Sequence, residues 1–163
     1  MVDECFKRGL LILGAGRNVL RLCPPLVLSA EGKSFSAGGD INDFDGSGSE
    51  HMHDLMGRIS HRWFRAFWNL PQPVIGAING PSVGIGTTMQ LAMDMRLAST
   101  EARFGFVFAR RGITPEAASA WFLPRIVGIS RALEWCETGR IFGADEALAG
   151  GLVRSVHEPD ELL

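Results

Sequence analysis

Residues 75–94 read IGAINGPSVGIGTTMQLAMD, which predicts a strand, a glycine-rich turn and a helix in immediate succession. The apolar run Pro73–Ile78 is typical of a strand that is buried on both faces. Asn79–Pro81 ends that strand, and the glycines of Gly84–Gly86 let the backbone pass close to a neighbour before the helix begins. A turn of this kind presents backbone N–H groups with the positive end of a helix dipole behind them. We therefore expect it to hold a phosphate or an oxyanion.

A second glycine-rich turn lies upstream, where residues 34–40 read SFSAGGD. It follows a short strand predicted over Leu26–Ser29, so Gly38 and Gly39 are placed to present bare N–H groups at a strand end. Taken alone, this segment fits an ordinary loop whose glycines supply positive φ angles. Its significance comes from the pairing with the first turn, because two such turns can offer donors to one ligand.

Composition restricts the class of protein. The chain has 163 residues, enough for one domain with a sizeable core, and its net charge of −2 gives no footprint for nucleic acid or an anionic membrane. No apolar run approaches the roughly 20 residues of a membrane span. The cysteines Cys5, Cys23 and Cys136 are odd in number and lack metal-ligand spacing. We expect reduced thiols, no metal site and a cytoplasmic location.

Further elements are predicted by periodicity and by capping residues, and their alternation indicates an α/β fold with parallel strands at its centre. Leu10–Arg17 looks like a strand entering a dinucleotide-binding turn, but Val19 stands where the third glycine belongs. The other predicted elements are an amphipathic helix over Met52–Leu70, a strand over Met95–Ser99, a helix from Thr114 ending by Pro124, a helix from Ser130 to Gly139, a short helix ending at Gly150 and a strand over Leu152–Val156.

Four motifs occur in the order seen in one protein family. They are VLSAEGKSFSAGGD at 27–40, PVIGAINGPSVG at 73–84, GITPEAAS at 112–119 and ADEALAGGLV at 144–153. Together they resemble the crotonase superfamily, the enoyl-CoA hydratase and isomerase family, from Leu26 to Leu163. The resemblance implies a crotonase-like (ClpP/crotonase) spiral core of short strands with flanking helices over residues 26–163. Residues 1–25 form an atypical N-terminal segment, and the usual C-terminal helices are not found, so the chain resembles a core truncated at both ends.

The resemblance also implies a chemistry. The family binds acyl-CoA thioesters and stabilises an enolate oxygen between two backbone amides, which fall here on Gly39 and Ile85. Coenzyme A is part of the substrate, and no separate cofactor is expected. The remaining substrate-binding positions implied by the resemblance are Ala37, Gly38, Asp40, Ile41 and Gly84. The family also implies a homo-oligomer, either a trimer or a hexamer.

The proton chemistry depends on a carboxylate. Family hydratases use two glutamates; here Thr88 holds the first position and Glu116 matches the second. A single glutamate with an apolar Ile85 in the oxyanion turn is the pattern of Δ3-Δ2-enoyl-CoA isomerases, so we expect Glu116 to be the catalytic base. Its pKa should be raised by partial burial near Phe106, Phe108 and Trp121.

Three alternatives to this assignment stay open. An acid in a first helical turn can merely complement the helix dipole, which would give Glu116 no catalytic role. The protein can also be an enoyl-CoA hydratase (a lyase) with an unidentified second group, or a non-catalytic remnant that binds acyl-CoA or a protein. A truncated core is expected to expose apolar side chains, with the Met52–Leu70 helix and the Trp121–Ile126 region as the candidate surfaces.

Overall fold

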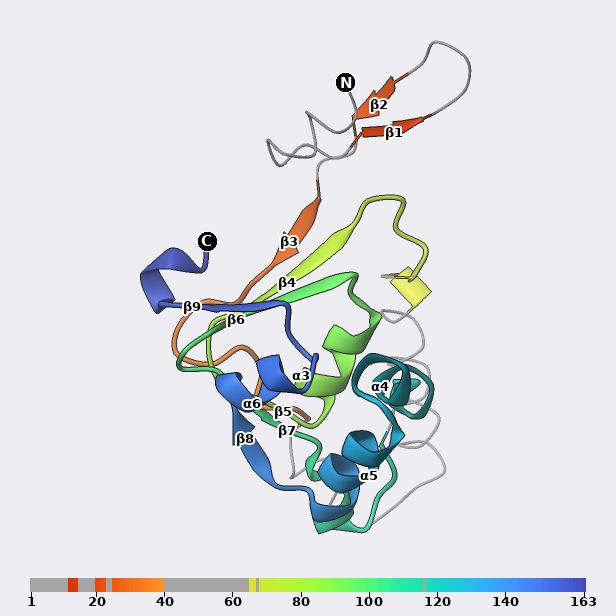
Figure 1. Ribbon diagram of the computed structural model, residues 1–163, viewed down its shortest axis with the longest axis vertical. Helices are drawn as coiled ribbons and strands as arrows, with labels where there is room; N and C mark the ends of the chain where they lie inside the picture. Colours follow the sequence, from red (N-terminus) through yellow and green to blue (C-terminus); the bar gives the residue numbers. More distant parts are fainter. Residues whose placement is uncertain (1–11, 15–19, 23–24, 40–64, 67, 116) are drawn as a thin grey trace.

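The computed structural model describes residues 12–14, 20–22, 25–39, 65–66, 68–115 and 117–163 (Figure 1). Its principal sheet has four parallel strands in the order β3-β4-β6-β9. The four strands are β3 (Leu26–Leu28), β4 (Val74–Ile78), β6 (Met95–Ser99) and β9 (Ser155–His157). β4 lies between two neighbours and its side chains are almost all buried, which confirms the strand predicted from the apolar run.

A second, smaller sheet has the order β5-β7-β8. β5 (Ser82–Val83) pairs in parallel with β7 (Arg103–Gly105), and β7 pairs antiparallel with β8 (Ile141–Gly143). β5 follows β4 after only three residues, so the chain turns directly from one sheet into the other. This is the crotonase-like arrangement expected from the sequence, although the three short strands of this second sheet were not predicted.

Some helix ends agree with those predicted from the capping residues in the sequence. α3 (Ile85–Thr88) starts directly after the glycine turn and continues as the 3-10 helix η2 (Met89–Ala92). α6 (Ala144–Ala149) ends at Gly150 as expected, and α5 (Ile129–Thr138) is closed by Gly139 in the left-handed conformation with φ 57°. The remaining helices are η3 (Val107–Arg111), α4 (Ser119–Val127) and η4 (Pro159–Glu161).

Four boundaries predicted from the sequence are wrong. α4 begins at Ser119 rather than Thr114, because Ala117 and Ala118 are both left-handed with φ 54° and cannot belong to a right-handed helix. α4 also continues past Pro124 to Val127. Pro124 has no backbone N–H and so costs the helix one hydrogen bond, but the buried Leu123 and Val127 side chains hold the helix against the core. Gly128, not Ser130, precedes α5. β9 starts at Ser155, after the predicted start at Leu152.

The core between the second sheet and α5 is aromatic. The Trp135 ring lies 4.1 Å from the Phe142 ring between centroids, and Phe106 stacks on the same indole at 6.2 Å. All three side chains are buried. The indole Nε1 of Trp135 donates to Glu146 at 2.9 Å, which satisfies the polar atom that this burial would otherwise leave unpaired.

The described part of the N-terminal segment is a hairpin of β1 (Ile12–Gly14) and β2 (Leu20–Leu22), which Figure 1 shows apart from the two sheets. The first strand coincides with the Leu10–Arg17 strand prediction, and its antiparallel partner excludes the dinucleotide-binding βαβ reading of that segment. Among the helices that the structure describes, none combines the length and hydrophobicity needed to traverse a bilayer.

Candidate active site

The turn after β4 is held by its own backbone. Gly84 precedes α3 with φ 58°, a conformation that favours glycine, and its amide donates to the Gly105 carbonyl at 2.9 Å. The Gly84 carbonyl in turn accepts the amides of Thr87 and Thr88 at 2.9 and 3.0 Å. The turn is therefore fixed to β7 on one side and to α3 on the other. Ile85 is the first residue of that helix, so its amide has no acceptor within the helix.

The upstream glycine turn docks directly on this one. The amides of Phe35 and Ser36 donate to the Pro81 carbonyl at 2.9 and 3.1 Å, and Val83 donates to the Ser36 carbonyl at 3.0 Å. Ser36 and Ser82 form an isolated parallel bridge. Two segments that are more than forty residues apart thus run side by side, as the sequence argument required.

Two glycines allow this close approach. A Cβ atom at Gly86 would lie 2.6 Å from the Ser36 carbonyl oxygen and 2.7 Å from the Ser36 Cβ, distances that real Cβ atoms essentially never show. A Cβ atom at Gly38 would lie 2.9 Å from the Val83 carbonyl oxygen, and Gly38 also has φ 92°. Any side chain at either position would hold the two turns apart. Glycine therefore allows one backbone to approach the other closely at both positions, as expected from the sequence.

The predicted oxyanion donors follow from this docking. Gly39 comes directly after Gly38, which touches Val83, and Ile85 comes directly after Gly84. Within the described part of the chain, neither the Gly39 amide nor the Ile85 amide donates a hydrogen bond to protein. That the two amides converge on one point stays a prediction. The proposed donor Gly39 is exposed. Among the expected substrate-binding residues, Ala37 is exposed, Gly38 is half-buried and Gly84 is buried, whereas Asp40 and Ile41 lie outside the described residues.

The helix behind the turn is short. α3 has four residues and then tightens into a 3-10 helix of four more. The dipole of so short a helix is weak, because few peptide units align. The helix dipole therefore stabilises negative charge less than expected, and the individual backbone amides of the turn contribute the greater part of the proposed stabilisation.

Glu116 lies outside the described residues, but its surroundings in the chain bear on its role. α4 begins three residues later at Ser119, and its first turn contains no acidic residue. Glu116 therefore precedes the first turn of α4 in the sequence, and its catalytic role stays a prediction. Ala117 and Ala118 both adopt the left-handed conformation, a strain that non-glycine residues carry mostly where function demands it.

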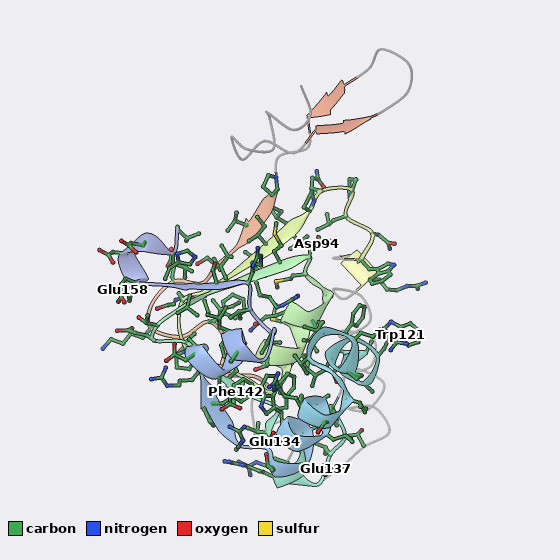
Figure 2. The ribbon with its side chains drawn as sticks, viewed as in Figure 1. Asp94, Trp121, Glu134, Glu137, Phe142 and Glu158 are labelled. Carbon is green, nitrogen blue, oxygen red and sulfur yellow. The ribbon has the colours of Figure 1, made fainter. Side chains whose placement is uncertain are left out.

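The aromatic residues expected around Glu116 divide between core and surface. Phe106 and Phe108 are buried, whereas Trp121 is 58% exposed. Because Glu116 lies outside the described residues, shielding of its carboxylate by these rings stays a prediction. Figure 2 shows Trp121 pointing outward from α4, and the Arg125 guanidinium lies 3.4 Å from its ring centroid. Trp68, which packs edge-on against Phe122, is 62% exposed. Trp121 belongs to the predicted Trp121–Ile126 surface. Trp68 belongs to the predicted Met52–Leu70 helix, of which only residues 65–66 and 68–70 are described, so that helix and its apolar surface stay predictions.

A group of buried polar residues beneath the turn was missed at the sequence level. Its members are fully buried and all come from one nine-residue segment; they are Ser82, Thr87, Thr88 and Gln90. Thr87 Oγ1 donates to the Ser82 carbonyl at 2.5 Å, and Thr88 Oγ1 donates to the Ile85 carbonyl at 3.3 Å. A signal was available, because polar residues at buried positions of an apolar segment require partners. Among the described residues, no group of three His, Cys, Asp or Glu side chains is placed to hold a metal.

Comparison with known proteins agrees with this architecture. The family model described as enoyl-CoA hydratase/isomerase matches residues 24–163. The chain belongs to the enoyl-CoA hydratase/isomerase family. This membership establishes the crotonase-like fold and an enzymatic family, and it covers all of the motifs described above.

Named relatives of this family member carry different activities. It is 35% identical to the short-chain-enoyl-CoA hydratase of Clostridium acetobutylicum over 93% of this chain and 58% of that protein. It is 40% identical to 4-chlorobenzoyl coenzyme A dehalogenase-1 of an Arthrobacter species over 80% of this chain and 49% of that protein. The chain thus spans about half the length of the curated relatives it matches.

A solved structure gives the same result. The enoyl-CoA hydratase/isomerase from Pseudoalteromonas atlantica T6c superimposes with a TM-score of 0.72 and 40% identity, covering 85% of this chain and 53% of that one.

Proposed function

We propose that this family member binds an acyl-CoA thioester and stabilises its enolate with the amides of Gly39 and Ile85. The observation that carries the proposal is the docking of the two glycine turns, joined by the Val83 to Ser36 hydrogen bond. An enolate oxygen develops negative charge in the transition state, so donors fixed beforehand are worth about 3–4 kcal/mol each. Backbone amides on glycine-rich turns suit this task because no side chain keeps the thioester away.

We further propose that the reaction is a Δ3-Δ2-enoyl-CoA isomerisation with Glu116 as the base. Glu116 removes a proton from the carbon next to the carbonyl and returns it two carbons away, so one carboxylate is sufficient. Thr88 supports this choice over hydration, because it occupies the position of the family's other glutamate. Its hydroxyl donates to the Ile85 carbonyl, and a neutral hydroxyl is no base at pH 7.

Hydration is the second candidate. It is favoured by one specific observation, the 35% identity to a short-chain-enoyl-CoA hydratase over nearly the whole chain. Addition of water across a double bond is helped by two groups that hold the water, and this chain would have to supply the second from a residue other than Thr88.

The test is incubation of the 163-residue chain with a trans-2-enoyl-CoA and, separately, with a 3-enoyl-CoA. Products are identified by mass spectrometry after chromatographic separation of the isomers. The isomerase predicts interconversion of the two thioesters without a change in mass, and exchange of solvent deuterium when the reaction runs in D2O. A gain of water would identify a hydratase, and no conversion of either thioester would leave a binding protein.

A further inference from the structure

Gln90 is a polar side chain in the core, immediately below the proposed oxyanion turn. It lies on η2 and is fully buried. Its amide nitrogen Nε2 donates to Ser82 Oγ at 2.5 Å and to the Gly86 carbonyl at 2.8 Å. One side chain therefore joins the strand that enters the turn to the helix that leaves it.

The two hydrogen-bond partners of Gln90 lie on either side of the Ile85 amide in the sequence. Ser82 lies three residues before Ile85, and Gly86 follows it directly, so Gln90 fixes both ends of the segment that carries the Ile85 N–H. Rotation of the Gly86 peptide or withdrawal of β5 would re-aim that amide. The hydrogen bond from Thr87 Oγ1 to the Ser82 carbonyl holds β5 independently of Gln90.

Gln90 is itself held by a partly buried cation. The Arg96 Nη1 atom donates to the Gln90 carbonyl at 3.1 Å and to the Met93 carbonyl at 2.7 Å. The Nε atom of the same guanidinium donates to the Leu152 carbonyl at 2.7 Å. Because Arg96 is on β6 of the principal sheet, a continuous hydrogen-bonded path runs from that sheet through Gln90 to the turn.

Stability alone does not account for a glutamine at this position. Its side-chain oxygen Oε1 is buried and has no hydrogen-bond partner among the described residues, which costs free energy that an apolar residue of the same shape would not incur. A side chain that carries such a cost while holding a glycine turn in place is expected where the geometry of that turn matters for function.

We propose that Gln90 is a positioning residue that aims the Ile85 amide at the substrate carbonyl. This inference rests on the proposed oxyanion function. Gln90 does not touch the substrate; it acts through Ser82 and Gly86. Removing its amide lets the turn relax, so polarisation of the bound thioester weakens while the binding of coenzyme A is unaffected.

The test compares Gln90→Leu and Ser82→Ala with the unsubstituted chain and with Phe142→Leu. Phe142 is a buried core residue on β8, separated from β5 by β7, so its substitution controls for lost stability without reaching the turn. Steady-state kinetics are measured with the enoyl-CoA substrate. The absorption maximum of bound cinnamoyl-CoA reports polarisation of its carbonyl.

Gln90→Leu is expected to lower kcat by about tenfold or more with KM changed less than twofold, as for loss of an interaction made only in the transition state. The red shift of bound cinnamoyl-CoA is expected to shrink in the same variant. Ser82→Ala should show a smaller effect in the same direction, and the double variant should match Gln90→Leu alone because both act through one contact. Phe142→Leu should lower the melting temperature with the red shift retained.

The outcomes distinguish a failure of the positioning role of Gln90 from a failure of the proposed oxyanion function. An unchanged red shift and kcat in Gln90→Leu, beside a lowered melting temperature, would overturn the positioning role. If Gln90→Leu does not fold, Ser82→Ala decides, and an unchanged red shift there overturns the role equally. Absence of any red shift in the unsubstituted chain would instead refute the oxyanion function itself.

Discussion

The Val83 amide donates a hydrogen bond of 3.0 Å to the Ser36 carbonyl oxygen, and this bond joins the two glycine-rich turns of the chain. The contact brings Gly38 against the Val83 backbone and Ser36 against Gly86. The proposed enolate stabilisation depends on this contact between the turns, because the proposed donors Gly39 and Ile85 directly follow Gly38 and Gly84.

Gly86→Ala should separate the two turns. The new methyl group would meet the Ser36 carbonyl oxygen and Cβ, atoms of the backbone and its first side-chain carbon that cannot swing away. We expect destabilisation by about 1–3 kcal/mol in urea unfolding and at least a tenfold loss of turnover. Gly143→Ala is the control, since its Cβ would have only one atom within 4.0 Å and its φ of −90° suits any residue. Equal behaviour of the two variants would contradict the packing argument.

Ala118→Gly should stabilise the protein. Ala118 is exposed and left-handed with φ 54°, a conformation that costs a non-glycine residue about 1–2 kcal/mol. Because glycine is also more flexible in the unfolded chain, the net gain should be about 0.5–1 kcal/mol. Ala120→Gly, an exposed position within α4, should destabilise by a similar amount. Both values come from denaturant unfolding, and a loss of stability in Ala118→Gly would show that the left-handed turn is not strained.

Arg96→Met should destabilise the protein strongly. Burial lowers the pKa of the Arg96 guanidinium, an effect that Asp94 opposes, and the guanidinium serves three backbone carbonyls. The substitution removes all three of these partly buried hydrogen bonds, for which we expect a loss of more than about 2 kcal/mol. Arg103→Met is the matched control, because that arginine also donates to carbonyls but is exposed. A loss below 1 kcal/mol for Arg96→Met would show that the clamp contributes little.

Glu146 should contribute to the loss of stability at low pH, the acid limb of the stability profile. Hydrogen bonds from the Arg140 guanidinium, and more weakly from Trp135, lower the pKa of Glu146 in the folded protein, while partial burial opposes them. A carboxylate with a lowered folded pKa contributes stability above its unfolded pKa and loses it as pH falls through the folded value. Glu146→Gln should therefore flatten the decline of melting temperature between about pH 5 and pH 3. An unchanged acid limb in Glu146→Gln would exclude this coupling, and Glu137→Gln, an exposed neighbour, serves as control.

The sequence predicted most of what positions the site. The apolar run before Asn79 and the glycines after it specify a buried strand and a tight turn, because each pattern has few structural alternatives. The docking of Ser36 onto Gly86 was accessible only through the family resemblance, since no local pattern encodes a contact between distant segments. The start of α4 was missed because Thr114 and Pro115 form a good cap, and the left-handed Ala117 and Ala118 have no signature in their residue type. Gln90 was missed because its partners are set by tertiary packing.

The central claim is tested most directly by Glu116→Gln, which keeps the shape of the side chain and removes the base. The variant and the unsubstituted chain are compared for acyl-CoA affinity by calorimetry and for conversion of 3-enoyl-CoA to 2-enoyl-CoA by chromatography. We predict unchanged binding and a fall in isomerisation of at least about 10²-fold, the usual cost of losing general acid–base help. Unchanged isomerisation in Glu116→Gln would contradict the account.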